Sequence, residues 1–564
     1  VATSREGLHS LAGAHHLGLD VLAPEAAVAL LVSDLSGHTP EDPRVDNEAE
    51  LGRLAALCGW LPLALEIAAA YLKRNPQLIP ERLANRLENA ASRVDKLKDP
   101  DRGTGQTRVL RAVFDTSLAY LDQSVAKVFL LVAAAPGPTL STTAAAVLTD
   151  LPADEAEEAL EELAAAHLLT QPAPGRWGAH DLLADYARHH PHPPQDRHQS
   201  IVRLLDHYMA ATAVSDDHLR TLPRQPISSF FPGPEAALGW LDTERATLVA
   251  AAMAAPALGH TEAAIHLPLN LSYYLGRRRR FEDAEQVLRS AQRAAHTIGN
   301  AHAEATAQTN LGTILMQTRR FDDAIIVHTR AREAFYQTGD TLSEAMAWNN
   351  LGAVLAEVRQ FQKAIEAHLC ARNLYQQVGD TYGQAQAWNN LGTVQAQALQ
   401  LEEAIEAHTR ACDLYQQVGN AHGEALVRTN LGATLRQMRR FKEAVEVLDL
   451  ACQAFHQAGD THSEAMAWNN LGLALRQVGR FDKAINAHTR ACILHRQVGD
   501  THAEAQAWGG LGVALLKAGR RTGAAEAAQR AVKLFESAGD HYRSSHSRVL
   551  LALIQQEPGD DAPA

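Results

Sequence analysis

Aromatic residues are scarce in this 564-residue chain, at 5% of the total. Alanine supplies much of the hydrophobic 46%, which favours closely packed helices over a core of large rings. The five cysteines form no CxxC pair and no metal-ligand spacing, and three of them, Cys412, Cys452 and Cys492, are 40 residues apart. These positions follow a repeat, so we expect small core side chains rather than disulfides or a zinc site.

Long apolar runs are also missing. No run approaches the ~20 residues of a membrane helix, and the first residues do not read as a signal peptide, so we expect a cytoplasmic protein with no membrane partner. The formal net charge of −13 argues against a general phosphate-binding surface, because duplex binding relies on Lys and Arg displacing counterions.

A 40-residue period dominates the C-terminal half. The pair Leu-Gly recurs at this step, at Leu311-Gly312, Leu351-Gly352, Leu391-Gly392, Leu431-Gly432, Leu471-Gly472 and Leu511-Gly512. In one unit Trp348, Leu351 and Leu355 share a helical stripe, and a second amphipathic helix from Phe361 ends at Gly379. A single hairpin of this kind cannot bury its stripe alone, so successive hairpins must stack.

The unit resembles the tetratricopeptide repeat, whose pattern runs W-x2-L-G-x2-Y and later A-x3-F. The segments Trp348–Leu355 and Ala364–His368 carry the match, with His in place of the Phe. The resemblance implies an α-solenoid of about seven repeats over residues 261–540, then a capping helix and tail at 541–564. Arrays of this family hold a protein or peptide.

An asparagine precedes the Leu of nearly every unit, at Asn270, Asn310, Asn350, Asn390, Asn430 and Asn470. Asparagine is a mediocre helix former, so its repetition inside a helix needs a reason. By resemblance to peptide-binding arrays, these amides line the concave groove and bind a ligand's backbone, since an amide offers a donor and an acceptor. The alternative is that each amide bonds the backbone of a neighbouring repeat.

Histidine and arginine follow the period too. His328, His368, His408 and His488 form a column, which we expect to be neutral packing groups rather than a pH sensor working between pH 5 and 8. Arginines gather at the hairpin turns, as at Arg319-Arg320 and Arg439-Arg440. This positive rim is either a solvated edge or a surface that steers an acidic partner.

The first 190 residues carry three short motifs in order: Thr3-Ser4-Arg5, Gly59-Trp60-Leu61-Pro62-Leu63 and Ala179-His180-Asp181. Together they resemble the sensor, GxPL and MHD motifs of the NB-ARC nucleotide switch. By that resemblance Arg5 senses the terminal phosphate, Pro62 packs against adenine and His180 contacts the β-phosphate of ADP. Taken singly, Pro62 starts a helix and His180-Asp181 caps one.

The same resemblance divides the N-terminal half. We expect the end of a nucleotide-binding α/β domain at 1–20, a helical NB-ARC subdomain at 21–105, a winged-helix subdomain at 106–191 and a helical linker at 192–260. The winged helix includes a hairpin at Leu168–Gln171 and Arg176–Ala179. Two segments of the linker, Leu204–Tyr208 and Ala237–Ala246, resemble the linker of Streptomyces antibiotic regulatory proteins. The predicted fold is therefore mainly α: a helical and winged-helix remnant of an NB-ARC module followed by a tetratricopeptide solenoid.

Neither a P-loop nor a Walker B strand occurs in this sequence. In NB-ARC proteins both precede the motif found here at Thr3-Ser4-Arg5. ADP or ATP is expected as a ligand only if such a segment lies upstream of Val1; otherwise the module is a remnant that does not hydrolyse ATP. A helix predicted at Asp154–Ala165 carries six carboxylates, so we expect no direct binding of nucleic acid.

No nucleophile elbow, metal-ligand cluster or catalytic carboxylate pair is recognisable, so the chain is not predicted to be an enzyme. The prediction is the sensor half of an ADP/ATP-controlled, transcription-regulating NB-ARC–tetratricopeptide protein, with a protein or peptide in the groove. The alternative is a stand-alone adaptor with a vestigial nucleotide module. Self-association is compatible with both.

Overall fold

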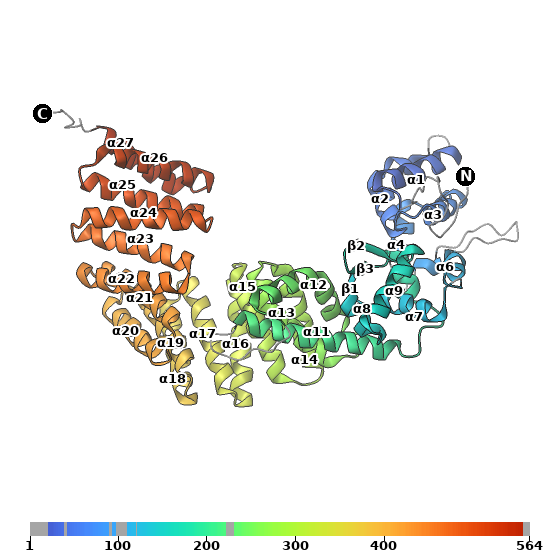
Figure 1. Cartoon of the computed structure of the whole chain (residues 1–564), viewed down its shortest axis with the longest axis horizontal. Helices are drawn as coiled ribbons and strands as arrows, with labels where there is room; N and C mark the ends of the chain where they lie inside the picture. The colour runs from blue at the N-terminus through green and yellow to red at the C-terminus, as the bar shows by residue number, and fades with distance from the viewer. Residues whose placement is uncertain are drawn as a thin grey trace. The chain divides into compact units, whose positions relative to one another are not determined.

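The computed structural model describes residues 21–38, 42–88, 93–96, 110–119, 121–220 and 231–556. Helices account for most of them, as predicted (Figure 1). The chain divides into two compact units, Val1–Ile298 and Gly299–Ala564. Thr3-Ser4-Arg5 lies outside the described residues. None of the described helices is long and apolar enough to cross a membrane.

The first unit begins with four helices, α1 (Pro24–His38), α2 (Glu48–Leu57), α3 (Pro62–Arg74) and α4 (Pro80–Glu88). Helix α1 packs on α2 and α3, and α2 packs on α4. Through one arginine, a 3-10 turn, η1 (Pro43–Asp46), is bonded to α3 and to the loop after it. The Arg44 guanidinium pairs with Asp42 (2.6 Å) and donates to the carbonyls of Leu72 (2.8 Å) and Leu78 (3.1 Å). The loop before α2 is therefore fixed to both ends of the segment between α3 and α4.

The next part mixes short helices with a small sheet. Its elements are α5 (Arg93–Lys96), α6 (Leu110–Ala119), α7 (Gln123–Val132), β1 (Leu140–Ser141), α8 (Thr142–Thr149), α9 (Ala153–Ala165), β2 (Thr170–Ala173), β3 (Arg176–Gly178) and α10 (Asp181–Arg188). The strands pair antiparallel in the order β1-β3-β2, so the predicted hairpin is present, but its first strand begins at Thr170 and not at Leu168. Buried Trp177 donates from Nε1 to Thr142 Oγ1 (2.9 Å). All six carboxylates of α9 are exposed, so its outer face is strongly acidic.

Two long helices, α11 (Arg197–Arg220) and α12 (Pro234–Ala254), follow the sheet. Glu244 of α12 pairs with Arg176 of β3, and the Thr247 hydroxyl donates to the Thr139 carbonyl (2.6 Å). Helix α11 packs on α8 and on α13 (Thr261–Arg277), which forms a hairpin with α14 (Phe281–Thr297). Helices α11 and α12 of the predicted linker are therefore packed within the first unit.

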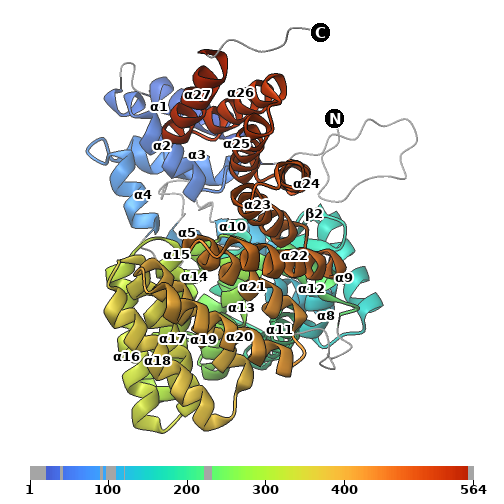
Figure 2. The same cartoon turned by 90° about the vertical axis from the view of Figure 1, so that its left-hand side faces the viewer.

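The second unit is a stack of six further hairpins and one last helix. The first helices of the hairpins, called A helices, are α15 (Ala301–Gln317), α17 (Thr341–Glu357), α19 (Thr381–Gln397), α21 (Ala421–Gln437), α23 (Thr461–Gln477) and α25 (Thr501–Lys517). The second, called B helices, are α16 (Phe321–Thr338), α18 (Phe361–Val378), α20 (Leu401–Gln417), α22 (Phe441–Ala458), α24 (Phe481–Gln497) and α26 (Arg521–Ser537). Each B helix packs on its own A helix and on the next one (Figures 1 and 2). Helix α27 (His541–Gln556) packs on α26.

The repeated Gly-Asp or Gly-Asn sequence explains each junction between hairpins. Gly339 ends its B helix with φ of 73°, a left-handed conformation that glycine adopts without strain. The next residue caps the following A helix: the Asp340 carboxylate accepts from the Ser343 N–H (3.0 Å). The same cap recurs at Asn300, Asp380, Asn420, Asp460, Asp500 and Asp540. The predicted hairpin boundary is confirmed.

The turn inside each hairpin also needs a left-handed residue, and in four of the hairpins an arginine supplies it. Positive φ angles occur at Arg279, Arg319, Arg359, Leu399 and Arg439, and the last two hairpins have Gly479 and Gly519 instead. Neighbouring rim arginines form ion pairs, as in Arg320–Asp323 (2.7 Å) and Arg520–Asp482 (2.7 Å). The rim charge is thus partly neutralised within the chain, and steering of an acidic partner stays a prediction.

Candidate functional site

The Gly59–Pro62 motif forms a tight turn between α2 and α3. Gly59 and Trp60 are both left-handed, with φ of 63° and 52°, and the Trp60 carbonyl accepts from the Leu22 N–H (3.0 Å). Pro62 is exposed at the first position of α3, where a missing N–H has no cost. Cys58, just before the turn, is fully buried, and burial raises the pKa of its thiol to about 12. This thiol is a packing group.

His180 lies directly against this turn. Its ring is so close to Gly59 that a β-carbon added there would stand 2.0 Å from His180 Cε1. His180 also caps α10, since Nδ1 accepts from the Leu182 N–H (3.4 Å). Two of the three motifs, far apart in the sequence, are therefore in contact. The helix-start role of Pro62 and the cap role of His180 are confirmed, and their nucleotide roles stay a prediction.

The asparagines of the A helices form a ladder between repeats. Asn390 Nδ2 donates to Asn349 Oδ1 (3.2 Å), and Asn430 Nδ2 donates to Asn389 Oδ1 (3.0 Å). The first member, Asn270, donates instead to α11, at Thr212 Oγ1 (3.3 Å) and the Met209 carbonyl (3.4 Å). Asn310 also has a partner in the chain. The partner of Asn390 and Asn430 is thus a side chain of the preceding repeat, not the backbone that the structural alternative predicted.

Asn350 and Asn470 differ from the other members. Thr309 and Thr429 stand where the preceding repeat would need an asparagine acceptor, and both hydroxyls donate to carbonyls of their own helices. Within the described residues, neither amide has a hydrogen-bond partner. One turn before each lies an exposed methionine, Met346 or Met466 (47% and 45% exposed). The sequence interpretation missed these methionines, although they recur at the repeat spacing.

The histidine column lies beneath the repeated glycines. An added β-carbon on Gly352 would be 2.7 Å from the His368 ring, so only glycine leaves room for the imidazole. His328, His368 and His408 are almost completely buried, and burial lowers the pKa of each to about 4. Burial and the charge of Arg476 lower the pKa of His488 to about 3. These imidazoles are neutral between pH 5 and 8, as predicted. Of the three periodic cysteines, two are buried and Cys412 is half-buried.

The comparisons with known proteins agree with this architecture. Tetratricopeptide repeat models match residues 269–337, 343–417, 423–497 and 463–537. The chain is 36% identical over 279 residues to the regulatory protein AfsR of Streptomyces griseus, which covers 47% of this chain and 28% of AfsR. It is 35% identical over 266 residues to AfsR of Streptomyces coelicolor, covering 44% and 26%. The chain therefore spans less than a third of the length of these relatives.

Among solved structures, a signal transduction ATPase with numerous domains (STAND) that has a tetratricopeptide repeat sensor, from Pyrococcus horikoshii, aligns with 96% of this chain and 70% of its own. The TM-score is 0.57 at 14% sequence identity, which shows a shared fold. The resemblance to tetratricopeptide-repeat regulators is thus confirmed, and the nucleotide motifs stay a prediction. Residues 269–337, 343–417 and 423–537 are tetratricopeptide repeats, and the chain is similar in sequence to Streptomyces regulatory proteins and in fold to a STAND protein with a repeat sensor.

Proposed function

We propose that this chain is the sensor half of a nucleotide-controlled regulator, in which the repeat array captures a protein or peptide. The relatives AfsR are named regulatory proteins, and the array of the Pyrococcus protein is named a sensor. The observation that carries the proposal is the pair of free amides at Asn350 and Asn470, each beside an exposed methionine. A free amide next to a flexible apolar side chain suits an extended peptide, which offers backbone donors and acceptors between its side chains.

The free and the bonded asparagines allow a direct test. A peptide library displayed on phage would be selected on the chain, and binding of a selected peptide would then be measured by fluorescence anisotropy. The double variant Asn350→Ala/Asn470→Ala removes two contacts of about 1 kcal/mol each, so we expect roughly thirtyfold weaker binding. The melting temperature should not fall, because neither amide has a partner in the chain.

Asn390→Ala is the matched control. It removes the bond to Asn349 and should lower the stability of the array by about 1 kcal/mol. Unchanged peptide affinity in the double variant would refute the role of these amides in capture.

We also propose that the contact between Gly59 and His180 is half of a nucleotide site. The phosphates of a bound nucleotide need a P-loop, whose backbone N–H groups this sequence does not supply. We therefore expect the chain as it stands to bind ADP only in the millimolar range, as measured by isothermal titration calorimetry. Micromolar binding that is lost in His180→Ala would show that this half suffices. Micromolar binding that His180→Ala leaves intact would contradict the role given to His180.

A further inference from the structure

One repeat shows how the array holds a guanidinium group. In the repeat 461–500, Trp468 Nε1 donates to Glu464 Oε1 (3.0 Å). Arg490 donates to the same oxygen (3.0 Å), and its guanidinium carbon lies 5.1 Å from the centre of the Trp468 ring. Glu464 is almost completely buried. A carboxylate and an aromatic face together therefore bind this cation, through charge and through the negative face of the ring.

This cluster of a carboxylate, a tryptophan and an arginine recurs in other repeats with changes. In the repeat 501–540 Arg530 lies 5.7 Å from the ring of Trp508, whose Nε1 donates to Glu504 (3.1 Å). The arginine that pairs with Glu504 there is Arg496 (2.8 Å). The repeat 341–380 keeps the first two members, since Trp348 Nε1 donates to Glu344 Oε1 (3.3 Å). Its third member is Cys370, which stands where the other two repeats have arginine. The short thiol leaves the space of a long cationic side chain open.

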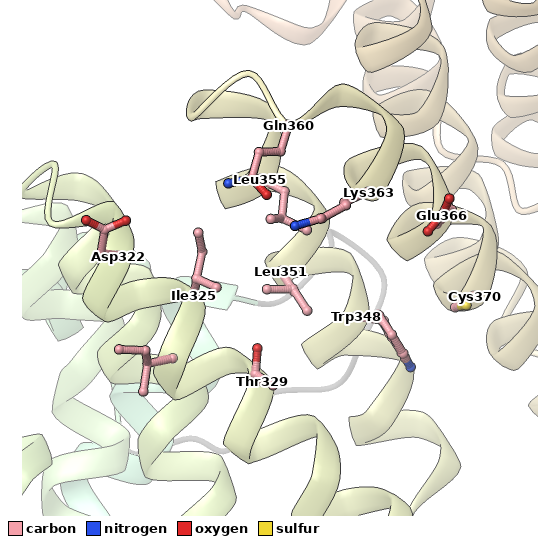
Figure 3. A pocket seen from close by; sticks show the side chains of 11 residues that line it. Asp322, Ile325, Thr329, Trp348, Leu351, Leu355, Gln360, Lys363, Glu366 and Cys370 are labelled. Atoms are coloured by element: carbon pink, nitrogen blue, oxygen red, sulfur yellow. The ribbon is translucent and has the colours of Figure 1, made fainter.

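A pocket of about 660 Å³ opens at this place, between α16, α17 and α18 (Figure 3). Trp348, Leu351 and Leu355 of α17 line it, with Ile325 and Ile326 on α16. Ile326 is 48% exposed. Its position is polar in the later hairpins, as Glu366, Glu406, Glu446, Asn486 and Glu526. Two residues that depart from the repeat pattern, Ile326 and Cys370, thus line the same pocket.

Two carboxylates and one amine line the pocket, those of Asp322, Glu366 and Lys363, so the net charge of the lining favours a cation. Burial, together with the carboxylates of Glu344 and Glu366, raises the pKa of the Cys370 thiol, and Arg332 opposes this effect. The guanidinium carbon of Arg332, a residue of α16, lies 4.7 Å from the centre of the Trp348 ring. The ion pair of Arg332 is with Glu333 (2.8 Å). Among the described residues no arginine pairs with Glu344, unlike Glu464, and Glu344 adjoins the pocket through its hydrogen bond with Trp348.

We propose that the pocket between α16, α17 and α18 receives an arginine side chain of a protein partner, which takes the place that Arg490 holds within the chain. The apolar wall of Ile325, Ile326 and Leu351 would cover the aliphatic stem of that arginine, and Glu344 with the Trp348 ring would bind its guanidinium. The inference rests on the proposed capture of a protein or peptide. It concerns another face of α17 from the one that carries Asn350.

The first test uses a small probe on the full chain with isotope-labelled tryptophan. N-acetyl-arginine amide would be titrated, and the indole resonance of Trp348, assigned with Trp348→Phe, would be followed by NMR. We expect a saturable shift of this resonance, and no shift with N-acetyl-citrulline amide, which has the same shape without the charge. Absence of a saturable shift, or an equal shift with citrulline, would overturn the proposal.

The chain offers a matched pair of variants. Cys370→Arg should fill the pocket from α18 and abolish the titration without lowering the melting temperature, because arginine is native at this position in three later repeats, as Arg410, Arg490 and Arg530. Leu450→Arg is the control: it adds the same charge at the same repeat position, where Arg428 replaces the tryptophan, and should leave the titration unchanged. An unaltered titration in Cys370→Arg would refute the site.

A third variant removes the charge without filling the pocket. Glu344→Gln should weaken binding of N-acetyl-arginine amide at least tenfold, and this result does not depend on whether Cys370→Arg folds. Full retention of binding would contradict the assignment. Library peptides that still bind through Asn350 while the arginine probe fails would refute this pocket alone. Failure of both would refute the proposed capture as well.

Discussion

Acidification from pH 6.5 towards pH 4 should unfold the repeat array, and the buried histidines should be the cause. Unfolded imidazoles take up protons near pH 6.5, whereas His328, His368 and His408 in the folded array do so only near pH 4. The unfolded state therefore binds more protons throughout this interval, so stability is present above pH 6.5 and is lost as the pH falls. By pH 4 each buried imidazole lowers the free energy of unfolding by about 3 kcal/mol. The histidines lie in neighbouring repeats of one stack, so their effects fall on the same structure.

Far-ultraviolet circular dichroism during a pH titration measures this loss. The informative variant is His328→Leu/His408→Leu, because both rings have a nitrogen without a hydrogen-bond partner and Leu448 occupies the same place beneath Gly432 in the native chain. The double variant should stay helical to a lower pH. The capping aspartates Asp340, Asp460 and Asp540 do not confound the result, because the pKa of each carboxyl is lowered from its ordinary value. An unchanged transition in the double variant would show that other groups control acid unfolding.

The repeat period made much of the array predictable. The Gly-Asp sequence specifies both a left-handed helix end and the next cap, so hairpin boundaries follow from chemistry that acts over four residues. The ladder was less accessible, because its bonds join side chains 41 residues apart, as in Asn349 with Asn390. The doubled asparagines were the available signal. The first asparagine of a pair, Asn349 or Asn389, accepts a hydrogen bond from the asparagine of the next repeat, and a threonine at that position leaves the next asparagine without this bond.

The sites outside the strict period could not be derived from the period itself. Contact between Gly59 and His180 depends on how α2, α3 and α10 pack, which no local pattern encodes. The arginine pocket arises from two exceptions, Ile326 and Cys370, on adjacent B helices. Cys370 was visible in the sequence as the cysteine that does not share the spacing of the other three repeat cysteines. Deviations from a repeat are therefore as informative about binding as the repeat is about fold.

Two glycines of the Leu-Gly pairs should respond in opposite ways to the same substitution. Gly352→Ala places a methyl group 2.7 Å from the His368 ring, which must move and strain its bond to Asn349 (2.9 Å). Overpacking of this kind costs about 1–3 kcal/mol, and loss of the buried hydrogen bond adds to it. Alanine gains about 1 kcal/mol of helix propensity over glycine, so the expected net destabilisation is about 2 kcal/mol.

Gly512→Ala is the matched control, because Ala528 replaces the histidine beneath it. The added methyl group would stand 3.4 Å or more from its neighbours, an ordinary contact, so the gain in helix propensity should raise stability by about 0.5–1 kcal/mol. Urea unfolding gives both values, and hydrogen exchange of α17 and α18 localises the first. His368→Ala combined with Gly352→Ala recreates the Gly512 environment with the methyl group present and should recover helix protection. Equal responses at Gly352 and Gly512 would show that the imidazole does not determine the need for glycine.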